Sequence, residues 1–80
     1  MEKIEVETIS TGERSSVKVT IVVRDEEFFI DARHMFKDDF GHWLHTKKGL
    51  HVTLEVAEQV CIVLAQAIKE AKTLASVKIG

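Results

Sequence analysis

The sequence has a single cysteine, Cys61. One cysteine excludes an intramolecular disulfide, which fits a reducing compartment. The paired Cys and His ligands typical of zinc sites are missing, so we expect no metal and no cofactor. No apolar run approaches the roughly 20 residues that span a bilayer, and the first residues lack the features of a signal peptide. We therefore expect an intracellular protein (in the cytoplasm or nucleoid, or the nucleus of a eukaryote) with no membrane partner.

The sequence also lacks an excess of basic charge, because its 80 residues carry a net charge of -2. This balance excludes a polycation and confines any nucleic-acid site to a local basic patch. No nucleophile motif surrounds a serine, and the Asp38-Asp39 pair is typical of a turn, so we expect a binding protein rather than an enzyme. A chain this short builds only a modest core and is expected to need a partner.

Two segments alternate between apolar and polar residues, as strands with two different faces do. They are residues 17–23 and 28–36. Residues 42–46 and 50–52 are shorter strand candidates, which we expect a turn at Lys47-Lys48-Gly49 to separate. Residues 1–16 are acidic and predict either an edge strand or a tail.

A long helix follows Thr53, whose hydroxyl is a good N-cap. Residues 54–75 contain no glycine or proline, and one apolar stripe at helical spacing, including Cys61, is expected to pack on the sheet. Further apolar residues lie off this stripe, and such surplus surface predicts a second copy of the chain as its cover. The predicted interface residues are Val56, Val60, Ile62 and Val63. The alternative is a wide apolar stripe on a monomer.

These elements predict an α+β fold. Four strands, or five with the N-terminal segment, would form a curved antiparallel sheet, followed by one long C-terminal helix that forms the dimer. We divide the chain into an N-terminal strand or tail (1–16), a single β-β-β-β-α domain (17–76) and a C-terminal end (77–80). The helix would cover one face of the sheet and leave the other free for a ligand.

Basic and aromatic residues alternate between residues 29 and 48. They are Arg33, Lys37, Lys47 and Lys48, with Phe29, Phe36, Phe40 and Trp43 between them. Cations that follow phosphates and flat rings that stack on bases are what single-stranded nucleic acid requires. The alternative, which composition alone favours because the net charge is negative, places these rings in the core and the two lysines in a solvated turn.

An ordered set of short motifs within residues 28–55 resembles the core of the positive cofactor four transcriptional coactivator family, whose members bind single-stranded DNA. The motifs are Ile30-Asp31-Ala32-Arg33, Phe36, Asp38-Asp39-Phe40-Gly41, Lys47-Lys48-Gly49-Leu50 and the helix that begins at Leu54. They follow the order of the family without an insertion. The similarity extends over about residues 17–72.

The resemblance implies a dimer through the helix, with single-stranded DNA lying across the exposed face of the sheet. By position, Arg33 and Lys48 would contact phosphates, Phe36 would stack on a base, and Lys47 would add a basic contact. Arg24 and Trp43 are further candidate contacts. The resulting hypothesis is a homodimer that binds single-stranded DNA or RNA with little sequence preference, and works with transcription, replication or repair proteins.

The chain departs from the family in the connector 24–27. Three acidic residues, Asp25, Glu26 and Glu27, stand where the family usually has glycine, lysine and an aromatic that reaches the DNA. We therefore expect weaker binding with a strong salt dependence. The alternative hypothesis is a dimeric protein-interaction module that kept the fold and binds nucleic acid weakly or not at all, with Phe40 and Trp43 as protein contacts.

Overall fold

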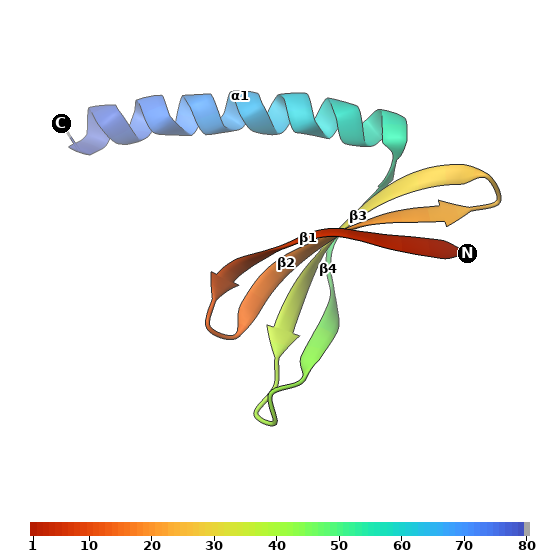
Figure 1. The fold of residues 1–80 in the computed structure, drawn as a ribbon. Helices are drawn as coiled ribbons and strands as arrows, with labels where there is room; N and C mark the ends of the chain where they lie inside the picture. Colours follow the sequence, from red (N-terminus) through yellow and green to blue (C-terminus); the bar gives the residue numbers. More distant parts are fainter. Residues whose placement is uncertain (80) are drawn as a thin grey trace.

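The structure, a computed structural model, describes residues 1–79, with side chains through Val77 (Figure 1). Gly80 and the side chains of residues 78 and 79, within the C-terminal end, lie outside the described part. Four strands precede one helix: β1 (Glu2–Gly12), β2 (Ser15–Arg24), β3 (Glu27–Lys37), β4 (Trp43–Thr53) and α1 (Leu54–Ile79). The strands form one antiparallel sheet in the order β1-β2-β3-β4. The α+β class is confirmed, and the N-terminal segment is an edge strand.

The sheet has two faces of different character, because side chains alternate along each strand. The register pairs Lys18 with Arg33 and Val19 with Ala32, so the alternation of β2 matches that of β3. We call one side the polar face; it carries Lys3, Glu5, Ser16, Lys18, Thr20, Val22, Arg24, Phe29, Asp31, Arg33, Met35, Lys37, Trp43, His45 and His51. We call the other side the apolar face; it carries Ile4, Ile9, Val17, Val19, Ile21, Val23, Phe28, Ile30, Ala32, His34, Phe36, Leu44, Leu50 and Val52.

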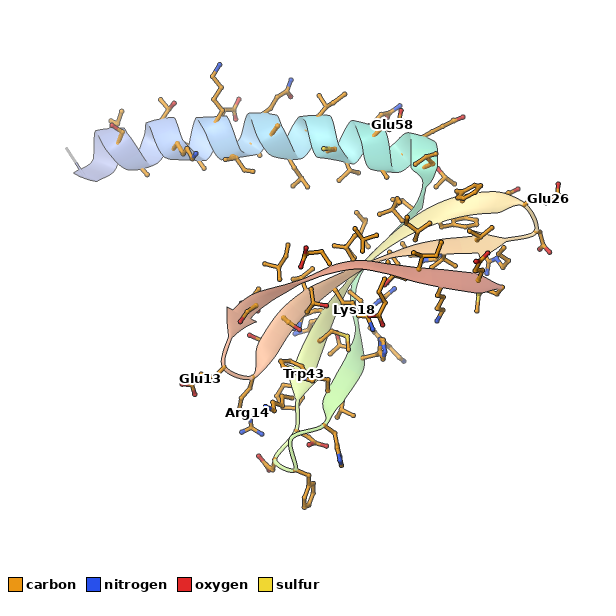
Figure 2. The ribbon with its side chains drawn as sticks, viewed as in Figure 1. Glu13, Arg14, Lys18, Glu26, Trp43 and Glu58 are labelled. Carbon is orange, nitrogen blue, oxygen red and sulfur yellow. The ribbon has the colours of Figure 1, made fainter. Side chains whose placement is uncertain are left out.

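The acidic connector is a two-residue turn between β2 and β3. Arg24 pairs with Glu27, and the two residues between them have positive φ angles, 52° at Asp25 and 67° at Glu26. Such turns suit the right-handed twist of a hairpin, but they usually contain Asn-Gly because side chains disfavour this conformation. Figure 2 shows Glu26 at the tip of the hairpin, so the acidic residues lie at one end of the sheet.

The predicted turn at Lys47-Lys48-Gly49 is wrong, because β4 continues through it as one strand. Arg33 pairs with Gly49 and Met35 with His45, so three residues of β4 bulge opposite His34 alone. The Thr46 hydroxyl donates to the His34 carbonyl at 2.7 Å and accepts a bond from the Lys48 amide at 3.2 Å. The composition at this point therefore coincides with an irregularity in β4, but pairing with β3 on both sides makes that irregularity a bulge and not a turn.

Gly49 is required at the end of this bulge. Its φ is +154°, and a Cβ atom here would overlap the carbonyl oxygen of Ala32 on the neighbouring strand. Glycine permits both the conformation and the close approach of the two backbones. The bulge that presents Lys47 and Lys48 thus depends on this residue.

The helix begins as expected but does not pack on the sheet as expected. The Val56 amide donates to the Thr53 hydroxyl at 3.4 Å, which confirms the N-cap. In the described part of the chain α1 contacts only β3 and β4, and every side chain from Cys61 to Val77 is exposed (Figure 1). Cys61 is therefore not a core residue of the single chain. No helix in the described residues is long and apolar enough to cross a membrane.

The helix leaves the end of β4 and lies apart from the sheet along most of its length (Figure 1). As a result the apolar face of the sheet has no complete cover. Among the residues described, the only buried apolar side chains are Val22 and Met35, each 5% exposed, and both lie on the polar face. One chain alone therefore leaves two apolar surfaces in water, one on the helix and one on the sheet.

Candidate nucleic-acid interface

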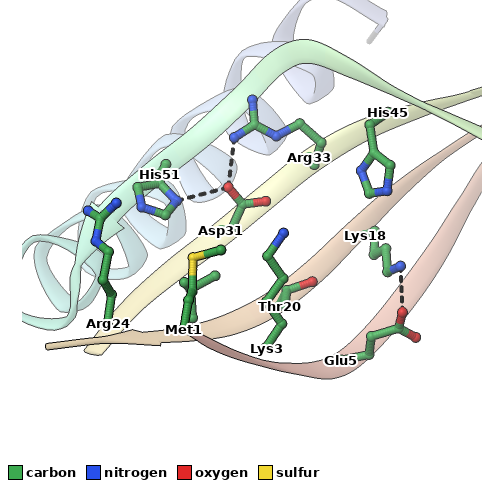
Figure 3. Close-up of a pocket in the computed structure, with 11 residues that line it drawn as sticks. Met1, Lys3, Glu5, Lys18, Thr20, Arg24, Asp31, Arg33, His45 and His51 are labelled. Atoms are coloured by element: carbon green, nitrogen blue, oxygen red, sulfur yellow. Dashed lines mark hydrogen bonds and ion pairs between the residues drawn. The ribbon is translucent and has the colours of Figure 1, made fainter. Parts of the chain in front are cut away.

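The polar face is hollowed into a cleft of about 320 Å³ (Figure 3). All four strands contribute to its lining. The charged and titratable residues there are Lys3, Glu5, Lys18, Arg24, Asp31, Arg33, His45 and His51. The two edge strands both border the cleft, because Glu5 on β1 and His45 on β4 line it.

The cleft is positive although the chain is negative. Four Lys and Arg side chains line it against two carboxylates, while the whole sequence carries a net charge of -2. Clefts that concentrate charge of one sign attract ligands of the opposite sign. The structure thus contains a local basic patch, which a nucleic-acid site on a chain of negative net charge requires.

Two of these cations are held by carboxylates. Lys18 Nζ lies 2.5 Å from Glu5 Oε1, and the hydrogen bond from Lys18 holds the pKa of Glu5 below its ordinary value. Arg33 Nη2 donates to Asp31 Oδ1 at 2.7 Å. Burial alone would raise the pKa of Asp31, but the hydrogen bonds from Arg33 and His51 outweigh it and lower that pKa. Asp31 is therefore ionised at neutral pH and fixes the direction of Arg33.

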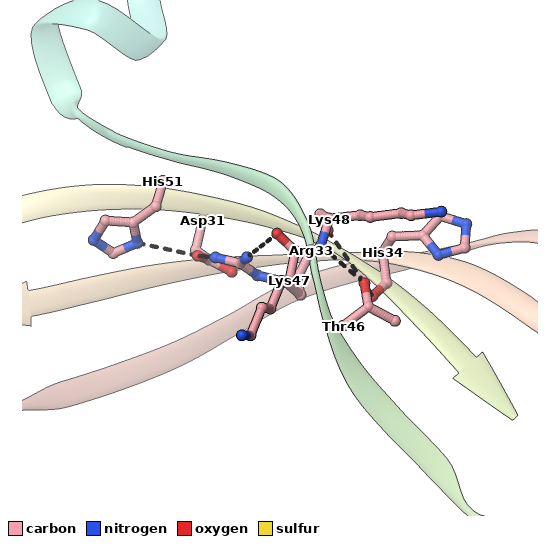
Figure 4. A network of polar contacts seen from close by, with 7 residues as sticks. All are labelled: Asp31, Arg33, His34, Thr46, Lys47, Lys48 and His51. Carbon is pink, nitrogen blue, oxygen red and sulfur yellow. Dashed lines mark hydrogen bonds and ion pairs between the residues drawn. The ribbon is translucent and has the colours of Figure 1, made fainter. Parts of the chain in front are cut away.

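The predicted phosphate contacts fall into two places. Arg24 and Arg33 line the cleft, and Arg33 Nη1 also donates to the Lys47 carbonyl at 3.3 Å, so the bulge lies beside the cleft. Figure 4 shows that Lys47 and Lys48 leave the bulge in different directions. Within the part of the chain whose side chains are described, Arg24, Lys47 and Lys48 make no ion pair. These three cations are available to phosphates.

The two predicted stacking residues lie on opposite faces. Trp43 is on the polar face, 46% exposed, with Lys37 Nζ 5.8 Å from its ring centroid. Phe36 is on the apolar face, 45% exposed, with Arg14 5.8 Å from its ring centroid. The structure therefore places Phe36 across the sheet from Arg33 and Trp43. Strict alternation along the strand would have shown this, since Phe36 lies three positions after Arg33.

A pair of rings that sequence reasoning did not single out lies next to Arg24. The rings of Phe29 and His51 are stacked, with centroids 5.2 Å apart and an interplanar angle of 16°. Arg24 Cζ lies 5.1 Å from the Phe29 centroid, and His51 Nδ1 lies 3.0 Å from Asp31 Oδ1. The two rings are 22 positions apart in the sequence, and only the register beyond the bulge brings them together.

The predicted interface residues of the helix are mostly exposed. Val56 is 44% exposed, Ile62 62% and Val63 60%. Val60 is half-buried. Ile68, Leu74 and Val77 extend this exposed apolar surface along the helix. An apolar surface of this length on a helix marks an interaction site.

Neither a protein-family model nor a curated protein matches the sequence. Solved structures of two proteins are similar. BPSL1147, a PC4 homolog from Burkholderia pseudomallei, has a TM-score of 0.75 at 17% identity over 86% of this chain and 93% of that one. A bacteriophage T5 homolog of the eukaryotic transcription coactivator PC4, implicated in recombination-dependent DNA replication, has a TM-score of 0.67 at 20% identity over 98% of this chain and 90% of that one. At these identities the likeness shows the fold, which is that of PC4 homologs.

Proposed function

We propose that this chain is a PC4-type homodimer that binds single-stranded DNA or RNA with little sequence preference. The observation that carries the proposal is the positive cleft on the polar face of a negatively charged chain. Cations that follow the backbone and rings that stack on bases are the two requirements of such binding. The fold shared with two PC4 homologs supports it, and the T5 homolog's link to DNA replication supports a role in transcription, replication or repair.

The proposed path of the strand follows the predicted phosphate contacts. It runs along the polar face past Arg24 and Arg33, with a base on Trp43, and then reaches the bulge. Because β4 is an edge strand, Lys47 and Lys48 stand at the rim of the sheet. A strand that crosses this rim can also reach Phe36 on the apolar face, which is how Phe36 would take part.

The proposed dimer would bury the apolar surfaces that the single chain leaves exposed. The exposed apolar surface of the helix and the open apolar face of the sheet both need a partner. A second copy offers the same two surfaces, so a twofold arrangement can cover both at once through self-complementary contacts. Val56, Val60, Ile62 and Val63 are the proposed contact residues.

Fluorescence anisotropy with a labelled oligo-dT tests the proposal, beginning at low salt. Replacing Lys47 and Lys48 together with alanine should weaken binding and reduce the salt slope by about 1.4, since each phosphate contact on a single strand contributes about 0.7. The matched control is Lys69→Ala with Lys72→Ala, which removes the same charge from the exposed helix and should leave the slope unchanged. A wild-type protein that does not bind, or an equal loss in both variants, would contradict the proposal.

The second candidate function is a dimeric protein-interaction module without nucleic acid. Its support is the carboxylate partner on each of Lys18 and Arg33, together with the acidic turn at Asp25 and Glu26. This candidate predicts no binding of the oligonucleotide even at low salt. The same titration therefore separates the two functions.

A further inference from the structure

We propose that the stacked pair Phe29–His51 is a nucleobase-binding site, with Arg24 holding the adjoining phosphate. The inference rests on the proposed function and names a subsite within it. The pair lies on the polar face, and its His51 and the neighbouring Arg24 both line the cleft. A flat ring beside an available cation is the combination that a stacked nucleotide uses, and here the partly exposed His51 ring, backed by Phe29, offers it.

The two rings are held before any ligand arrives. Phe29 and His51 lie 5.2 Å apart and nearly parallel, at 16°. Asp31 Oδ1 fixes His51 from the side at 3.0 Å, and Arg24 lies over Phe29 at 5.1 Å. A site whose side chains are already ordered loses little conformational entropy on binding. The His51 side chain is still 38% exposed, so part of its surface is open to a ligand.

The chemistry of His51 favours a base over a simple anion. With Asp31 ionised, Nδ1 carries the proton and donates to the carboxylate. The second ring nitrogen, Nε2, is then a hydrogen-bond acceptor when the ring is neutral and a donor when it is charged. A flat heterocycle seated on the rings would meet both a stacking surface and a polar edge. The cleft volume of about 320 Å³ is at the small end of the roughly 300–1,000 Å³ of ligand sites, which suits one nucleotide.

The test compares two ligands that carry the same number of phosphates. One is labelled oligo-dT, and the other is an abasic oligomer of the same length in which every base is missing. Phe29→Leu keeps an apolar side chain in the half-buried position but removes the flat ring. It should weaken oligo-dT binding about 5- to 150-fold, the loss expected for one stacked base. Binding of the abasic oligomer should not change.

A second variant and two controls separate stacking from folding. His51→Gln keeps a polar side chain but loses the ring, and should also weaken only oligo-dT binding. Phe28→Leu removes a ring from the apolar face, and His42→Gln removes an exposed imidazole from the loop between β3 and β4; neither should discriminate between the two ligands. Thermal unfolding confirms that each variant is folded.

These measurements distinguish a failure of the proposed base site from a failure of the proposed function. If Phe29→Leu and His51→Gln bind oligo-dT as tightly as the wild type, the base site is wrong while the proposed function stands. Equal weakening toward both ligands would also overturn the base site, because it shows a structural role. If the wild type binds neither ligand, the proposed function fails and the base site fails with it.

Discussion

The Arg33 guanidinium donates to the Asp31 carboxylate at 2.7 Å from the same face of β3, two positions along the strand. The predicted phosphate contact is therefore already oriented toward the cleft, and its charge is partly balanced. A phosphate that binds there meets a fixed donor rather than a mobile one. The same carboxylate lowers the net charge of the cleft.

Asp31→Asn should change the pH dependence of stability. Because the pKa of Asp31 is lowered in the folded chain, its contribution is fully present above the unfolded value of about 4 and is lost as the pH falls through the folded value. The variant should be less stable than the wild type at pH 6, and the difference should shrink as the pH falls below the unfolded value. Urea unfolding at fixed protein concentration measures this. A difference that stays constant as the pH falls below the unfolded value would show that the carboxylate charge is not responsible.

Asp25→Asn with Glu26→Gly should stabilise the turn between β2 and β3 and strengthen the binding of nucleic acid. Asn-Gly favours the positive φ angles found here, so we expect the free energy of unfolding to rise by about 1–2 kcal/mol. Removing two negative charges from the end of the sheet should also tighten oligo-dT binding at low salt. The control, Glu58→Gln with Glu70→Gln, removes two charges from the exposed helix. Equal tightening in the control would show that only net charge matters.

The sequence predicted the parts of the fold that depend on local pattern. The alternation in residues 17–23 predicted a strand with two different faces, and Thr53 marked the start of the helix; both predictions are confirmed. The pattern did not decide between strand and tail for residues 1–16, because β1 is exposed along its whole length and needs no apolar alternation. Only its pairing with β2 settles the question.

The sequence-based predictions were wrong or incomplete where contacts between distant residues override the local pattern. Lys47-Lys48-Gly49 has the composition of a turn, but β3 offers pairing partners on both sides of it, so the strand continues. The stack of Phe29 on His51 depends on that bulge and has no sequence pattern of its own. The helix stripe was expected to pack on the chain's own sheet, but its side chains from Cys61 to Val77 are exposed, and nothing in the local pattern says what covers them. The roles of the predicted contact residues stay predictions.

Gly49→Ala should destabilise the fold through the bulge. The added Cβ atom would overlap the Ala32 carbonyl oxygen, and the φ of +154° disfavours a side chain. We expect a loss of about 1–3 kcal/mol in the free energy of unfolding, measured in urea. Gly12→Ala is the matched control, because its Cβ would meet only the Ser15 hydroxyl at 2.9 Å, which can rotate away. Equal losses in the two variants would show that the bulge imposes no special requirement.

Ile62→Glu with Val63→Glu should separate the proposed dimer. Two charges placed within the apolar surface of the helix cannot be buried without a large desolvation penalty. Light scattering should give twice the 9.0 kDa chain mass for the wild type and the single mass for the variant. The control, Gln59→Glu with Gln66→Glu, adds the same charge at polar, exposed positions and should leave the mass unchanged. A wild type with the mass of one chain would contradict the dimer.

The proposed interface is tested most directly by mapping where a single strand of DNA contacts the sheet. An NMR titration of the isotope-labelled protein with oligo-dT follows each backbone amide. We expect chemical-shift changes at Arg24, along residues 29–33 and across the bulge at 46–51, with the helix beyond residue 62 unaffected. Absence of shifts at saturating oligonucleotide and low salt, or shifts confined to the helix, would contradict a nucleic-acid interface on the polar face.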